Sequence, residues 1–185
     1  MSTQKFRLER EKTAVVVVDL QERLMAAMKH AGKVYRNTGI MLEASAVLGL
    51  PVVVTEQYPK GLGHTVEEVK ACLPSYEPVE KITFSCCGEQ GFMDVLKKTD
   101  RKQVILLGSE THVCVYQTCL DLLEAGYGVH LLRDAVCSRA KENYLAALEL
   151  MRQAGAVITS TETVLFQLLV RAGGDEFKAI SRLVK

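Results

Sequence analysis

Short apolar runs rich in β-branched residues alternate along the chain with longer segments that have the periodicity of a helix. The first, second and fourth runs are almost continuously apolar, which is typical of strands covered on both faces of a parallel sheet. Because the joins are short, each helical segment can connect two parallel strands by the usual right-handed crossover. The expected strands are 13–19, 50–56, 77–84, 102–108, 127–134 and 156–161.

The helical segments predict a single layered domain. Gly126 and Gly155 directly follow two of them, where a left-handed residue commonly ends a helix. A chain of 185 residues is long enough to bury one core. We therefore predict an α/β fold: one doubly wound, three-layer domain over residues 1–185, with a parallel sheet of strand order 3-2-1-4-5-6. The expected helices are 33–48, 64–72, 90–98, 113–125, 141–154 and two more within 163–185.

The charge balance of the chain narrows its range of partners. Lys and Arg number 23 against 22 Asp and Glu, a formal net charge of +1. This balance has no signature of nucleic-acid binding, and the apolar runs are too short to cross a bilayer. Residues 1–12 are charged and lack the apolar stretch of a secretory signal. We expect a cytoplasmic protein that acts on a small molecule, without nucleic-acid or membrane partners.

The cysteines do not form a metal-binding pattern. None belongs to a C-x-x-C pair and no pair of histidines follows them at zinc-finger spacing, which argues against a structural zinc site. In a reducing compartment we expect these thiols to be free, and most free thiols are small buried hydrophobes. The six are Cys72, Cys86, Cys87, Cys114, Cys119 and Cys137.

The predicted sheet places three chemically useful residues at one edge. In open α/β sheets, ligands bind beyond the carboxyl ends of the strands, where the strand order reverses. Here that point lies between the first and fourth strands. Asp19 ends the first strand, Cys114 follows the fourth, and Lys81 lies near the end of the third. We expect the three side chains to reach the same crevice.

These residue types together suggest nucleophilic catalysis. Cys114 lies at the start of an expected helix, where the positive potential and free N–H groups favour a thiolate and can stabilise an oxyanion. Asp19 can accept the thiol proton, and Lys81 can balance the charge. Each residue also has an ordinary interpretation. Asp19 suits the N-cap of a helix in LQERLMAAM, Lys81 a solvated strand end, and Cys114 a buried structural thiol.

Three blocks of the sequence resemble the isochorismatase-like cysteine hydrolases. They are VVVVDLQE around Asp19, EKITFS around Lys81, and GSETHVCVYQTCLDLLEAGYGVHLLRDAVCSR around Cys114. The resemblance covers nearly the whole chain, and TEQYPKGLG (55–63) resembles most the isochorismatase domain-containing subgroup. It implies a triad in which Asp19 takes the proton, Lys81 stabilises the charges and Cys114 attacks a carbonyl or nitrile-like carbon.

The same resemblance implies how the backbone is arranged around the nucleophile. It places a cis peptide bond between Ser109 and Glu110. It also implies an oxyanion hole made by the backbone N–H groups of Glu110 and Cys114. As further residues of the substrate pocket we expect Gln21, Gln57, Tyr58, Phe84 and Thr111.

One segment departs from the metal-binding members of this superfamily. Nicotinamidases bind a metal through an aspartate and histidines just after the second strand. The corresponding segment here, Glu56 to Lys60, contains no Asp-x-His. We therefore expect no metal and no other cofactor, and leave open a weak metal site at Glu56 or His64.

The sequence leaves three functions to be separated. The first is a metal-independent cysteine hydrolase that cleaves a C–N bond in a small amide-like molecule. The second is an isochorismate-type vinyl-ether hydrolase that uses Asp19 as a general acid. The third is a non-catalytic α/β binding protein that retains the triad. We also expect a homo-oligomer, because the tail 163–185 is apolar around much of a helix and similar proteins are often dimers or larger assemblies.

Overall fold

The computed structural model describes residues 3–185 and contains a six-stranded sheet in which every neighbouring pair of strands is parallel. The strand order is β3-β2-β1-β4-β5-β6, so the predicted fold and order are confirmed. The strands are β1 (Thr13–Val18), β2 (Val52–Gln57), β3 (Val79–Lys81), β4 (Gln103–Ser109), β5 (Gly128–Cys137) and β6 (Val157–Thr159).

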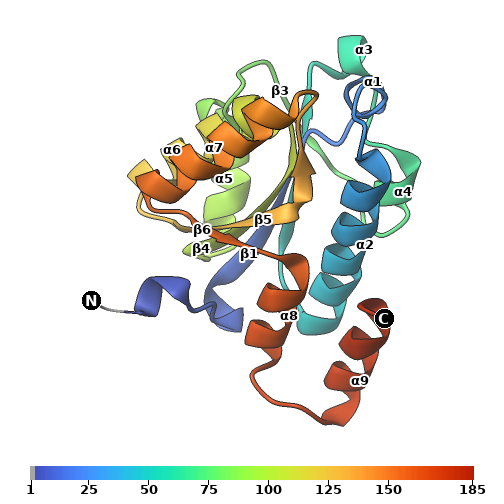
Figure 1. The fold of residues 1–185 in the computed structure, drawn as a ribbon, viewed down its shortest axis with the longest axis vertical. Helices are drawn as coiled ribbons and strands as arrows, with labels where there is room; N and C mark the ends of the chain where they lie inside the picture. Colours follow the sequence, from blue (N-terminus) through green and yellow to red (C-terminus); the bar gives the residue numbers. More distant parts are fainter. Residues whose placement is uncertain (1–2) are drawn as a thin grey trace.

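Helices cover both faces of the sheet and make the three layers (Figure 1). One face carries α2 (Ala31–Leu48), α4 (Glu67–Lys70), α8 (Thr161–Leu169) and α9 (Gly174–Leu183). The other carries α5 (Gln90–Lys98), α6 (Tyr116–Glu124) and α7 (Lys141–Ala154). Two short helices, α1 (Glu22–Met25) and α3 (Pro59–Leu62), lie at the end of the molecule where β1 and β2 finish. None of the helices within residues 3–185 has the length and apolarity of a transmembrane span.

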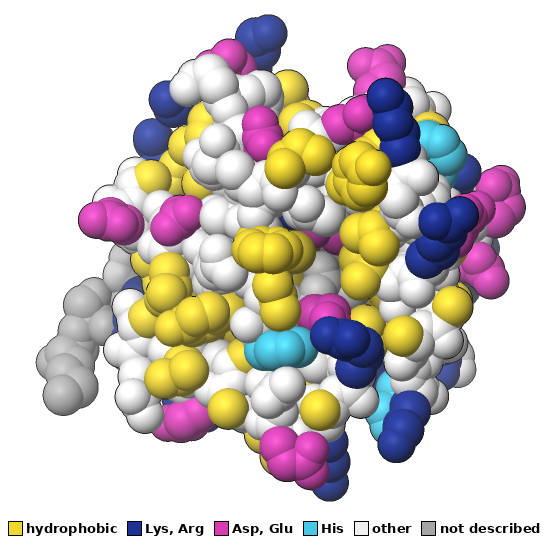
Figure 2. Space-filling model, turned by 90° about the horizontal axis from the view of Figure 1, so that it is seen from above, with side chains coloured by type: hydrophobic (Ala, Val, Ile, Leu, Met, Phe, Trp, Pro, Cys, Tyr) yellow, Lys and Arg dark blue, Asp and Glu magenta, His cyan; other side chains and the backbone are white. Residues whose placement is uncertain are grey.

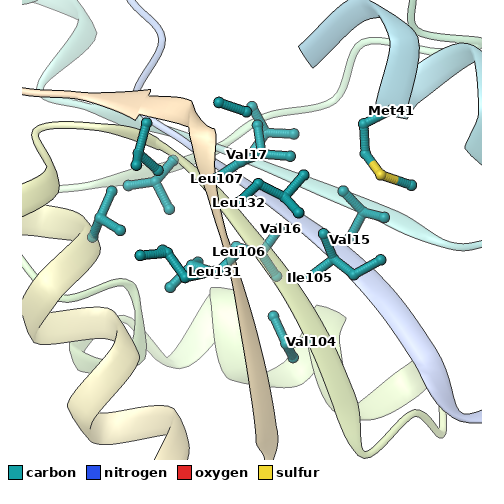
Figure 3. Close-up of a cluster of buried hydrophobic side chains, with 14 of the residues drawn as sticks. Val15, Val16, Val17, Met41, Val104, Ile105, Leu106, Leu107, Leu131 and Leu132 are labelled. Carbon is teal, nitrogen blue, oxygen red and sulfur yellow. The ribbon is translucent and has the colours of Figure 1, made fainter. Parts of the chain in front are cut away.

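The central strands form the core because both of their faces are covered. All six residues of β1 are buried, and Figure 3 shows their valines among the leucines of β4 and β5, with Met41 of α2 alongside. Burying one such side chain stabilises the fold by about 1.5–3 kcal/mol. This explains why the runs that became β1 and β4 have almost no polar residues.

The structure differs from the predicted elements mainly at their ends. The predicted helix 64–72 is reduced to α4, and the helix considered in LQERLMAAM is reduced to α1. Helix α3 was not predicted because a single turn shows no helical periodicity. Strand β5 continues to Cys137, because the pairing of β4 with β5 shifts register between Leu106 and Gly108. Short 3-10 turns also occur at Gln4–Phe6, Arg10–Lys12 and Cys86–Gly88.

Gly108 allows β1 and β4 to approach each other at their carboxyl ends. Its φ is +127°, and a Cβ atom there would lie 2.0 Å from the backbone oxygen of Val18. Just beyond this contact, the hydroxyl of Ser109 donates a hydrogen bond of 2.8 Å to the backbone oxygen of Asp19. The glycine therefore holds the two strand ends together at the point where the strand order reverses.

Candidate active site

Asp19 lies one residue beyond β1, in a left-handed conformation with φ of +48°, and its side chain is completely buried. Its carboxylate has two direct partners. Oδ1 accepts a hydrogen bond of 2.8 Å from the hydroxyl of Thr55, and Oδ2 lies 2.6 Å from Nζ of Lys81. The thiol of Cys114 is near enough for the thiol and the carboxylate to affect each other's pKa. The N-cap of α1 is Gln21, so the N-cap interpretation of Asp19 is wrong.

Lys81 is the last residue of β3, and its side chain is as inaccessible as that of Asp19. Besides Asp19, its ammonium group donates to Oε1 of Gln57 at 2.7 Å. It also donates to the backbone oxygens of Thr83 at 3.2 Å and Phe84 at 3.1 Å. These acceptors fix the ammonium group beside one carboxylate, so the solvated interpretation of Lys81 is wrong.

Cys114 lies in a π-helical turn, η4 (Thr111–Val115), which leads directly into α6. The helical segment thus begins at Thr111, before the predicted start at Val113. The backbone oxygen of Glu110 accepts from the N–H groups of Val113 at 3.0 Å and Val115 at 3.2 Å. Cys114 is 6% exposed, so its sulfur lies just under the surface.

The protonation state expected for Cys114 is wrong. Burial and the neighbouring Asp19 carboxylate raise the pKa of the thiol to about 12, and Lys81 offsets only part of this. The predicted effect of a helix start is therefore smaller than the effects of desolvation and of a nearby negative charge. A raised pKa favours the neutral thiol over the thiolate at neutral pH.

The two charged partners of the site have shifted pKa values as well. Burial raises the pKa of the Asp19 carboxyl above its usual range, against the opposing effects of Lys81, Thr55 and Cys114. Burial by itself would lower the pKa of Lys81, but Asp19 and the neighbouring thiols raise it. The ammonium therefore stays charged, while Asp19 is a stronger base than a carboxylate in water.

The segment before Cys114 is held by contacts with the end of β5. The Ser109–Glu110 peptide bond is cis. The carboxylate of Glu110 accepts hydrogen bonds from the backbone N–H of Arg139 at 3.0 Å and from its Nε at 3.1 Å. The ring Nδ1 of His112 lies 2.9 Å from the hydroxyl of Ser138. These contacts direct the polar side chains of Glu110 and His112 toward residues 138–139.

The residues expected to line the substrate pocket separate into two groups. Gln21 and Gln57 are structural: Gln21 bonds to the backbone of Gln57 and Gly63, and Gln57 bonds to Lys81 and to the backbone of Ile82.

The other three residues have side-chain groups that could contact a substrate. Tyr58 and Phe84 are 51% and 56% exposed. The hydroxyl of Thr111 is buried and has no hydrogen-bond partner among the described residues.

The surface next to β3 combines apolar and charged groups. Figure 2 looks onto the end of the molecule at which the strands finish, and yellow hydrophobic side chains gather around the middle of this face. Ile82, the residue after Lys81, is 68% exposed. A cavity of about 250 Å³ borders Lys81, and its other lining residues are Tyr58, Pro59, Lys60, Glu80, Ile82 and Glu89. The hollow beside Lys81 therefore offers both apolar surface and charges to a small molecule.

The weak metal site left open at Glu56 and His64 does not fit the geometry. Glu56 is buried, and Oε1 accepts from the N–H of Thr65 at 2.5 Å, from its hydroxyl at 2.8 Å and from the hydroxyl of Tyr76. Oε2 lies 3.0 Å from Nδ1 of His64. Both carboxylate oxygens are thus used within the protein, and the described residues include no group of three or more potential ligands.

Sequence reasoning missed Thr55 as a member of the site. It is the first polar residue after three valines in β2, and its hydroxyl bonds to Asp19. Cys86 was also missed: it is fully buried, and its sulfur lies 3.6 Å from the same hydroxyl. A polar residue interrupting a buried strand next to β1 is the signal that could have identified Thr55.

Comparison with known proteins gives a consistent result. The Isochorismatase domain matches residues 13–163. The chain is 43% identical over 183 residues to the secreted isochorismatase effector Isc1 of Phytophthora sojae, covering 97% of this chain and 87% of that protein. A MAR1 ribonuclease from Caenorhabditis elegans has a TM-score of 0.90 and 38% identity, covering 96% and 92% of the two chains. YcaC from Escherichia coli, described as an octameric hydrolase of unknown specificity, has a TM-score of 0.89 and 26% identity, covering 96% and 88%.

Proposed function

The chain belongs to the isochorismatase family of hydrolases, and from this premise we propose that it is a metal-independent cysteine hydrolase acting on a small amide-like molecule. One observation carries the proposal: a single buried carboxylate, Asp19, lies 2.6 Å from an ammonium group and near enough to the Cys114 thiol to alter its pKa. A nucleophile, its base and a fixed positive charge are the parts that covalent catalysis requires.

In the first half of the proposed reaction, Cys114 attacks the carbonyl carbon of the substrate. Asp19 accepts the thiol proton as the sulfur–carbon bond forms, and its raised pKa favours this transfer. The proton then passes to the departing nitrogen, the C–N bond breaks, and ammonia or an amine leaves. A thioester on Cys114 remains.

In the second half, water replaces the amine. Asp19 takes one proton from the water molecule while the oxygen bonds to the thioester carbon. The sulfur–carbon bond then breaks, the sulfur recovers the proton from Asp19, and a carboxylic acid is released. Lys81 remains charged in both halves and offsets the negative charge shared by Asp19 and the sulfur.

We assign the developing oxyanion to the backbone N–H groups of Glu110 and Cys114. Both residues belong to the turn that positions the nucleophile, so donors and sulfur move as one unit. The side chain of Glu110 is bound to Arg139 and does not compete for this role. Preorganised N–H donors of this kind are worth about 3–4 kcal/mol in related chemistry.

A covalent-capture experiment tests the proposal. The full chain is incubated with a panel of small amides and nitriles, and intact-protein and peptide mass spectrometry record adducts and released ammonia. We expect an acyl adduct on Cys114 that is lost in Cys114→Ala and retained in Cys119→Ala, a control thiol that is also buried. Adducts on another cysteine, or turnover by Cys114→Ala, would contradict the mechanism.

The same panel separates the other candidate functions. Turnover of a vinyl ether that survives Cys114→Ala but not Asp19→Asn would favour general-acid chemistry. An RNA oligonucleotide is included because the C. elegans relative is described as a ribonuclease. Tight binding of a panel compound without adduct or turnover would favour a binding protein.

We further propose that the protein is a homo-oligomer. The E. coli relative is described as octameric, and the C-terminal helices expose apolar groups here. Leu165 and Leu168 are buried, but Phe166 is 39% and Val170 is 85% exposed. Light scattering at micromolar concentration should report a multiple of 20.5 kDa, and Val170→Asp should reduce it. A wild-type monomer would contradict this proposal.

A cytoplasmic location is also proposed. All six cysteines are free, which suits a reducing compartment. The P. sojae relative is described as secreted, so location is tested by fractionating the source cells and comparing intracellular with extracellular protein.

A further inference from the structure

We propose that the protein has a second binding site, for a small organic polyanion bearing at least two phosphate or carboxylate groups. The site is a cavity of about 730 Å³ at the carboxyl end of β5, here called the basic cavity. Its volume lies within the range of about 300–1,000 Å³ typical of small-molecule sites. Asp19, Lys81 and Cys114 are not among its lining residues, so it is distinct from the proposed catalytic site.

Positive side chains reach the basic cavity from three separate elements. Lys29 and Lys33 come from the start of α2, Arg133 and Arg139 from β5 and the residues after it, and Lys141 from the start of α7. All five are exposed. The whole chain has a net charge of only +1, so this concentration of cations in one hollow is a local feature. Figure 2 shows dark blue and cyan side chains in the lower central and lower right part of this face.

Arg139 is already paired, because its Nε lies 3.1 Å from the carboxylate of Glu110. The negative groups in the lining do not neutralise the other four cations one for one. Asp134 and Glu142 are the two carboxylates of the lining. The carboxylate of Asp134 accepts hydrogen bonds of 3.0 Å from both the N–H and the hydroxyl of Thr161 in α8. Cations facing one another across a hollow repel each other unless an anion lies between them. A ligand with several negative charges would relieve this repulsion.

The backbone adds donors to the same space. Helices α2 and α7 contain 18 and 14 residues, and their N-cap residues, His30 and Ala140, both line the basic cavity. Neither residue makes a side-chain cap hydrogen bond. First-turn N–H groups and two helix dipoles therefore reinforce the attraction that the side chains provide.

The lining also indicates that the ligand has an organic part. The lining includes the half-buried Tyr144, together with Val34 and Val136, which are only 2% and 4% exposed. A bare inorganic ion would leave most of the volume unused. The chemistry that fits is a compact molecule with an apolar body and charged groups near its ends.

Isothermal titration calorimetry of the full chain tests this site. Citrate and inorganic pyrophosphate are the probes, titrated at constant ionic strength into wild-type protein. We expect one site per chain for at least one probe. The double variant Lys33→Gln/Arg133→Gln should weaken binding about tenfold, because two charge-assisted contacts are lost. The control Lys97→Gln/Lys98→Gln, on exposed positions of α5, should bind like wild type.

Two further results decide the interpretation. Binding should persist when Cys114 is alkylated in a Cys137→Ala background, because Cys137 lines the basic cavity and Cys114 does not. If alkylation abolishes binding, the anion occupies the catalytic site and the proposal is wrong. Absence of binding for both probes, or equal weakening in the two double variants, also overturns it. Circular dichroism melting confirms that each variant is folded.

Discussion

At the scale of single residues, the main finding concerns the protonation state of the proposed nucleophile. Cys114 has a pKa of about 12, because it is buried and lies beside a carboxylate. A thiolate would therefore be scarce at neutral pH, and in the proposed mechanism Asp19 removes the proton as the bond forms. Cys114 and Asp19 thus form a neutral acid beside a base, and not a thiolate paired with a cation. This distinction can be measured.

Asp19→Asn should separate thiol acidity from catalysis. The substitution removes the negative charge that raises the pKa of Cys114 and leaves Lys81, which lowers it. The pH midpoint of iodoacetamide alkylation at Cys114 should therefore fall, while hydrolysis falls by about 100- to 10,000-fold through loss of the base. Peptide mapping across pH 7–11 compares the two proteins: alkylation should rise at lower pH in the variant than in wild type, whose midpoint near 12 lies above this range. Cys119 is the internal reference. An unchanged midpoint would show that Asp19 and Cys114 do not interact.

Lys81→Met should raise the pKa of the Cys114 thiol further and lower the free energy of unfolding. It leaves Asp19 buried without its ammonium partner, which typically costs about 3–5 kcal/mol. The double variant Asp19→Asn/Lys81→Met removes both charges and should recover part of that loss. Urea unfolding of the four proteins in this cycle measures the coupling. If the two losses simply add, the buried pair is not the source of the effect.

At the scale of secondary-structure elements, the site depends on how closely the strand ends approach. Strands β1, β2, β3 and β4 deliver Asp19, Thr55, Lys81 and the turn containing Cys114 to one edge. Gly108 sets the distance between β1 and β4, and Glu56 ties β2 to the segment 64–76 that follows it. Gly108 and Glu56 have no role in the proposed reaction, but both help to position the residues that do.

Gly108→Ala should be much more harmful than a glycine substitution elsewhere. A Cβ at this position would lie 2.0 Å from a backbone oxygen, so β1 and β4 must separate. Backbone strain and overpacking together should cost more than about 3 kcal/mol. Gly155→Ala is the matched control: its φ is +115° but nothing lies within 4 Å, so we expect about 1–2 kcal/mol. Urea unfolding of both variants measures the difference, and equal losses would contradict the steric argument.

Glu56→Gln should weaken the fold in a pH-dependent way. Burial would raise the pKa of Glu56, but Tyr76, Thr65 and His64 hold it below the ordinary 4.5. A carboxylate with a lowered pKa stabilises the fold above about 4.5, and this stabilisation is lost as the pH falls through the folded value. The variant should lose about 1–3 kcal/mol at pH 7 and less at pH 4. Urea unfolding at both pH values tests this, with Glu124→Gln at an exposed position of α6 as the control; a constant loss would refute it.

At the scale of the whole molecule, the buried thiols make stability sensitive to alkali. Burial raises the pKa of Cys86 to about 11, and that of Cys87, Cys114, Cys119 and Cys137 to about 12. The unfolded chain releases these protons near the ordinary value of 9.0. A raised folded pKa stabilises the fold below that value, and the stabilisation is lost as the pH rises toward 12.

The free energy of unfolding should therefore decline from about pH 9 upward, by as much as about 1.4 kcal/mol per pH unit for each such thiol. Cys119→Ala removes one of these groups, since its shift arises from burial alone. The variant should be less stable at pH 8 because the shortened side chain leaves a cavity. Above pH 9 its free energy of unfolding should fall less steeply with pH, by the contribution of one thiol. Urea unfolding between pH 8 and 10.5 measures both slopes, and parallel slopes would contradict this explanation.

The sequence by itself determined the fold class, the strand order and the three principal site residues. Apolar runs such as 13–19 specify strands buried on both faces, because only such strands can omit polar residues. Once the order of strands is known, Asp19, Lys81 and Cys114 must converge at one edge. These conclusions depend on periodicity and topology, which are properties of the chain taken in order.

Only the tertiary structure decided the protonation state of the site and the partners of its residues. Desolvation and charge depend on distances between elements, so the raised pKa of Cys114 could not be read from its place at the start of a helix. The roles of Thr55 and Gln57, and the full occupation of Glu56, depend on which strands are neighbours and on their register. The basic cavity likewise joins residues 29–34 to residues 133–144, because α2 and α7 begin at the same end of the sheet.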